Sequence, residues 1–142
     1  MFRSLHLETL LILGGIGHLA LAFSSLAIPY LLGWKQELQA LRPLTRRVFW
    51  TYSSYIFGIH LWFATVSICA AGPLAAGGVL PRLVTGFISL YWAMRIVVQF
   101  AFYDRSVRRE RLLFRLGEIS YVVLFAALTL IYGFVTVHGT RM

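Results

Sequence analysis

The chain alternates between long apolar runs and short polar segments, and the pattern repeats four times. Each run has at least the roughly 20 residues that a helix needs to cross about 30 Å of hydrocarbon. The predicted membrane-spanning helices cover about 8–33, 48–71, 83–103 and 116–137. Because the connections are short, consecutive helices should be antiparallel neighbours. The pattern predicts an all-α, polytopic membrane protein, one domain over residues 1–142 with four transmembrane helices in an up-down-up-down antiparallel bundle.

Composition supports a membrane protein and excludes several other classes. Hydrophobic residues make up 59% of the 142 residues and charged residues 13%, against about 45–50% and about 25% in soluble domains. A soluble domain of this size could not bury so much apolar surface. The single cysteine, Cys69, excludes a disulfide framework, a CxxC redox pair or a thiolate zinc site within one chain.

Basic residues predict the orientation. Nine of them lie in the two segments that would share one side of the membrane: Lys35, Arg42, Arg46, Arg47, Arg105, Arg108, Arg109, Arg111 and Arg115. The other side carries Arg3, Arg82 and Arg141. The positive-inside rule then places both basic loops in the cytoplasm and both termini outside. We expect a bacterial inner-membrane protein, whose charge of +8 serves the membrane surface and not nucleic acid.

The second basic loop is a candidate membrane-surface site. Arginines there attract anionic lipid headgroups by about 1 kcal/mol each. The predicted surface residues are Arg105, Arg108, Arg109, Arg111 and Arg115. The plainer interpretation is that they only determine topology.

Ionisable and polar residues inside the predicted spans are the main functional signal. Such residues cost about 2.5–3.5 kcal/mol each on insertion scales and usually face the bundle interior. At about 1.5 Å per residue, His18, His60 and Arg95 each lie about 15–18 Å from one end of their helices. Three helices should therefore bring a polar group to the same level near the midplane.

Helix periodicity groups further residues with these three. Tyr91, Arg95 and Gln99 recur at intervals of four, so they share one helix face. Corresponding faces on the second and fourth spans carry Ser53, His60, Ala64 and Ser67, and Glu118, Tyr121, Phe125, Tyr132 and Thr136. We expect these faces to meet in the bundle interior.

The leading hypothesis is a small ligand-binding or accessory subunit, with Arg95 holding a carboxylate, a phosphate or a quinone-type carbonyl. The predicted ligand-binding residues are Arg95, His18, His60, Tyr91, Gln99 and Glu118. The alternatives for Arg95 are snorkelling to an interface, a structural ion pair with Glu118, and a contact with another subunit. A homo-oligomer or a larger membrane complex would fit this role.

An alternative function is electron transfer by haem b, with His18 and His60 as axial ligands. Helices one and two should lie about 8–10 Å apart, which is too close to hold a porphyrin between them. Haem would then need a second copy or a partner's histidine. The competing interpretation is that each histidine makes one interhelical hydrogen bond.

Enzymatic function is less favoured. The only aspartate, Asp104, lies at the predicted inner interface, so a Ser-His-Asp triad cannot form near either buried histidine. The chain has no HExxH motif, paired carboxylates or phosphate-binding glycine loop. The remaining alternative is a small membrane enzyme or proton-relay component that acts on a lipid or quinone.

Overall fold

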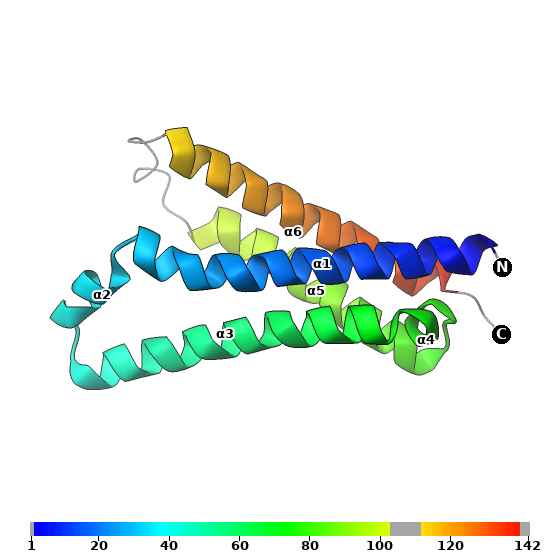
Figure 1. Cartoon of the computed structure of the whole chain (residues 1–142), viewed down its shortest axis with the longest axis horizontal. Coiled ribbons are helices and arrows are strands. Elements are labelled where there is room, and N and C mark those ends of the chain that lie inside the picture. The colour runs from blue at the N-terminus through cyan, green and yellow to red at the C-terminus, as the bar shows by residue number, and fades with distance from the viewer. Residues whose placement is uncertain (1, 103–111, 140–142) are drawn as a thin grey trace.

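The computed structural model describes residues 2–102 and 112–139, and these residues contain helices and no strand. Four helices are long: α1 (Phe2–Leu31), α3 (Pro43–Cys69), α5 (Val79–Phe102) and α6 (Leu112–His138). Short helices lie in the connections: α2 (Trp34–Glu37), a 3-10 turn η1 (Leu38–Ala40) and α4 (Ala71–Ala75). Consecutive long helices run in opposite directions along the molecule (Figure 1).

Three of the long helices are long and apolar enough to cross a membrane. Their candidate spans are Ser4–Leu31, Val79–Ala101 and Leu116–His138, which indicates a multi-pass membrane protein. Helix α3 has 27 residues but is not among them, since the hydroxyl-bearing residues 51–55 and His60 lower its mean hydropathy. Three of the four predicted spans therefore have the length and composition that crossing requires, and membrane crossing by α3 stays a prediction.

The helix boundaries differ from the predicted runs at their polar ends. Helix α3 begins at Pro43, where proline's fixed φ suits the first helical turn. The connection before α5 contains the short helix α4. Gly77 and Gly78 then turn the chain with φ of 81° and 100°, values that favour glycine.

Glycines on α1 allow close helix contacts. A Cβ at Gly15 would lie 3.3 Å from the Ala64 carbonyl oxygen on α3, and one at Gly14 would lie 2.9 Å from the Tyr132 hydroxyl on α6. Helix α1 therefore approaches both helices where it lacks side chains. Helices α1 and α3 form one closely packed pair, α5 and α6 form the other, and α1 also contacts α6.

Hydrogen bonds link α5 to α6 along their length. Ser89 donates to the Thr129 carbonyl oxygen at 2.9 Å, and Thr136 donates to Thr85 at 2.8 Å. Nearer the chain termini, Arg82 donates to the Gly139 carbonyl oxygen at 3.5 Å. Interhelical hydrogen bonds in membranes stabilise by roughly 0.6 kcal/mol each, so these contacts orient the pair and add to its packing.

Burial is concentrated in one half of the bundle. Among described residues of the long helices, the last buried residue of α1 is Ala22, the first of α3 is His60 and the first of α6 is Phe125. The starts of α3 and α6 lie far apart at the other end (Figure 1). Most of the core therefore lies in the half that contains α4, although on α5 burial continues to Gln99. The large apolar side chains exposed elsewhere suit contact with lipid.

Replacing Gly14 with alanine should destabilise the fold, because the added methyl would meet the Tyr132 ring. We expect a net loss of about 1–2 kcal/mol, the overpacking cost less the gain in helix propensity. Gly58→Ala is the matched control, since nothing lies within 4 Å of its Cβ position. Unfolding in mild detergent measures both variants, and equal stability of the two would contradict the close approach at Gly14.

Candidate functional site

The four long helices meet around His18 on α1, which is 0% exposed. Its ring centroid lies 5.2 Å from Phe63 and 6.4 Å from His60, both on α3. It lies 5.4 Å from Trp92 on α5 and 5.6 Å from Tyr132 on α6. We call these five residues the histidine cluster. Because each long helix contributes to it, the cluster forms only when the whole bundle is assembled.

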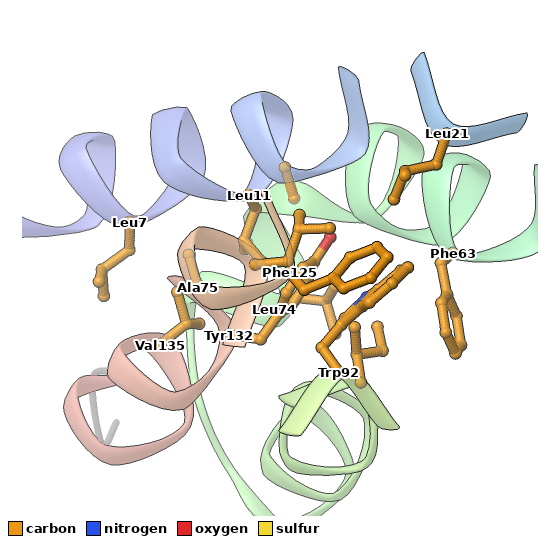
Figure 2. Packing of buried hydrophobic residues seen from close by; sticks show 13 residues of the cluster. Leu7, Leu11, Leu21, Phe63, Leu74, Ala75, Trp92, Phe125, Tyr132 and Val135 are labelled. Atoms are coloured by element: carbon orange, nitrogen blue, oxygen red, sulfur yellow. The ribbon is translucent and has the colours of Figure 1, made fainter. Parts of the chain in front are cut away.

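A stack of flat groups runs from His60 towards Arg95. The His60 and Trp92 rings are 5.4 Å apart and inclined by 11°, and Trp92 and Phe125 are 4.9 Å apart and inclined by 25°. Trp92 and Phe125 lie against each other in Figure 2. The Arg95 guanidinium carbon lies 5.5 Å from the Phe125 centroid, a cation–π distance. Arg95 therefore contacts a ring that stacks on Trp92, and Trp92 in turn stacks on His60.

Several buried nitrogens in the cluster lack hydrogen-bond partners within the described residues. They are both ring nitrogens of His18, Nδ1 of His60 and Nε1 of Trp92. A buried polar group without a partner costs about 1–3 kcal/mol, so one such group in a protein calls for an explanation. Here three neighbouring side chains carry such nitrogens at a single place in the bundle.

The hydroxyl group of the cluster, on Tyr132, does have a partner. The Tyr132 hydroxyl on α6 and the Ser67 hydroxyl on α3 are hydrogen-bonded to each other, and both residues are buried. The tyrosine reaches across α1 at Gly14, where a methyl group would collide with its ring. The glycine thus permits a polar bond between helices on either side of α1.

The predicted site residues separate into two groups. His18 and His60 meet in the cluster, and the Tyr91 ring packs edge-on against Trp92 at 5.2 Å. Gln99 donates to the Glu118 carboxylate at 3.4 Å, and this pair lies further along α5 towards residue 102. Ligand binding by either group stays a prediction, as does the role of Arg95.

The predicted membrane-surface arginines lie outside what the structure describes. The positions concerned are Arg105, Arg108, Arg109 and Arg111, together with the side chain of Arg115. Their proposed contact with anionic lipid therefore stays a prediction.

Packing around the histidines does not fit haem. A porphyrin ligated by His18 or His60 would occupy the space beside the imidazole. Trp92 stacks on His60, and Phe63 meets His18 edge-on with its centroid 5.2 Å away. Both rings would have to leave before a macrocycle could enter.

Hydrogen bonding and aromatic stacking are the chemistry that the cluster's side chains offer. Within the described residues, no group of three or more His, Cys, Asp or Glu could hold a metal ion. Comparisons of the chain with protein-family models, with curated proteins and with solved structures found no match.

Trp92 and Phe63 are the cluster residues that the sequence reasoning missed. The spacing that would have predicted the burial of Trp92 is visible along α5. The buried residues of this helix follow one another at steps of three, four and seven: Thr85, Ile88, Trp92 and Gln99. Such spacing marks the buried stripe of a packed helix. The predicted stripe through Tyr91, Arg95 and Gln99 lies beside it, which is why Tyr91 and Arg95 are only partly buried.

His18→Leu should not destabilise the ligand-free protein, because it replaces an imidazole without hydrogen-bond partners by an apolar side chain of similar size. We expect the free energy of unfolding to stay within about 1 kcal/mol of the original value or to rise. His6→Leu on the same helix is the control, since His6 is exposed. Thermal unfolding in detergent measures both, and a loss of several kcal/mol for His18→Leu would show a structural hydrogen bond instead.

Proposed function

We propose that this chain is a four-span protein of the bacterial inner membrane whose histidine cluster binds the polar head of a small, lipid-soluble ligand. The observation that carries the proposal is the set of buried nitrogens without partners on His18, His60 and Trp92. A bundle that keeps such groups forgoes the stability that an apolar core would provide. Sites of this kind are where proteins accept a local cost for function.

The hydrogen-bonding groups define what the ligand must offer. An indole N–H only donates, and a neutral imidazole offers one donor and one acceptor. The ligand should therefore carry acceptor oxygens, and it needs no net charge. The sequence-based hypothesis had Arg95 holding a carboxylate, a phosphate or a quinone-type carbonyl, and the cluster favours the uncharged carbonyl of these three ligands.

Arg95 has a different part in this proposal. Its guanidinium faces Phe125, which stacks on Trp92. A cation–π contact contributes about 0.5–2 kcal/mol, the larger value where water is excluded. Arg95 thus holds the far end of the aromatic stack and orients Trp92 through it.

Membrane crossing by α3 is part of the proposal. Its 27 residues span about 40 Å at 1.5 Å per residue, and it packs along α1. Basic residues near its start, Arg46 and Arg47, favour the cytoplasmic side. Both termini then lie outside, and the exposed apolar surface suits an accessory subunit in a homo-oligomer or larger complex.

Ligand retention should depend on His18. Protein purified in mild detergent should carry one small apolar molecule with acceptor oxygens, found by mass spectrometry of the extract. His18→Leu should reduce the amount bound at least tenfold, which corresponds to loss of about 1.4 kcal/mol. His6→Leu should leave it unchanged, and equal retention by the two variants would refute the proposed site.

Alkaline phosphatase fusions test the threading. Fusions after residues 77 and 139 should be active outside the cell, and a fusion after residue 36 should be inactive because it stays in the cytoplasm. If fusions after residues 36 and 77 behave alike, α3 does not cross the membrane. If all three activities are reversed, the orientation is wrong.

A further inference from the structure

An apolar groove lies between α3 and α5, beside the histidine cluster. Its volume is about 310 Å³. Residues of α3 and α5 form its walls: Ile59, Trp62, Phe63 and Val66 on α3, and Leu83, Val84, Phe87 and Ile88 on α5. This volume is at the small end of the roughly 300–1,000 Å³ found in ligand sites. The groove could therefore hold one tail segment of a lipid-soluble molecule.

Phe63 belongs to both the groove and the cluster. It is 3% exposed, it lines the groove, and its ring meets His18 edge-on. On the opposite wall, Ile88 lines the groove and Trp92 follows one turn later on the same buried stripe. One layer of side chains therefore separates the apolar groove from the unpartnered nitrogens.

The rim of the groove is exposed on the outer surface of the helix bundle. Trp62 and Phe87 on its two sides are 64% and 58% exposed. Because α5 is a candidate membrane span, molecules that reach the rim come from the bilayer. The occupant must be apolar over most of its length, with acceptor oxygens at the end that faces the cluster.

We propose that the occupant is a quinone, with its isoprenoid tail in the groove and its ring carbonyls facing His18 and Trp92; this rests on the proposed function. The head of a quinone is flat and uncharged, and its carbonyl oxygens only accept hydrogen bonds. These properties complement an indole N–H, an imidazole N–H and a stack of aromatic rings. A phospholipid would instead bring a charged headgroup, which hydrocarbon disfavours.

Phe63 controls entry in this arrangement. Its ring packs edge-on against Tyr91 at 5.3 Å and Phe87 at 6.2 Å on α5. The ring must turn aside for a quinone head to reach His18 from the groove. A change at Phe63 should therefore alter the rate of binding more than a change at the rim.

Tryptophan fluorescence in lipid nanodiscs provides the test, because quinones quench nearby indoles. A quinone with a ten-carbon tail should quench the protein's fluorescence saturably. Trp92→Phe and Trp62→Phe should each remove part of the saturable signal, because Trp92 faces the quinone head and Trp62 lines the groove. Val84→Phe, which fills the groove, should weaken apparent affinity at least tenfold. Val97→Phe, exposed on the same helix and outside the groove, should change it less than twofold.

The outcomes separate the two proposals. If Val84→Phe binds like the unaltered protein while His18→Leu does not, the groove assignment is wrong and the histidine site stands. If the quinone does not quench saturably, or if a lysophospholipid competes equally well, the quinone is not the occupant. Val66→Phe repeats the test from the opposite wall if Val84→Phe fails to fold. Co-purification with His18→Leu and His6→Leu assumes no ligand class, so it tests the proposed function by itself.

Discussion

The packing of the four long helices depends on one constraint: α1 has glycines and no side chains at positions 14 and 15, just before His18. Gly14 leaves room for the Tyr132 ring and Gly15 for the backbone of α3. Any side chain there would push α3 or α6 away. Because His18 follows within one turn, the closest approach of the helices also places its imidazole at the centre. The two glycines therefore set how closely α3 and α6 approach α1, and His18 fills the place where the four long helices meet.

The two helix pairs are held differently, and this shapes the site between them. Helices α5 and α6 are joined by hydrogen bonds from Ser89 and Thr136, whereas α1 and α3 meet through small residues. Between α3 and α5 the contact is looser, and the apolar groove lies there. A hydrogen-bonded helix pair therefore borders the groove, and the groove lies beside the histidine cluster.

The long helices and part of the histidine cluster could be predicted from the sequence. The lengths of the apolar runs predicted the long helices, and residue counts along the first two runs predicted that His18 and His60 lie at the same level. The predicted stripe ran through Tyr91, and Trp92, one residue later, points about 100° away from it on the helix. Which of the two neighbours faces the interior could not be decided from spacing alone. In the structure Trp92 points towards the two histidines, and Arg95 lies over Phe125. The unpartnered nitrogens were also beyond prediction, since they depend on side-chain packing among four helices.

The most direct test of the central claim is the contact between His18 and His60 in a bilayer. The chain has four histidines, so histidine-selective carbon-13 and nitrogen-15 labelling gives a simple solid-state NMR spectrum. The account predicts a cross-peak between two imidazole rings, matching centroids 6.4 Å apart, and its loss in His18→Leu. Cross-peaks from both rings to lipid methylenes, with none between the rings, would contradict it.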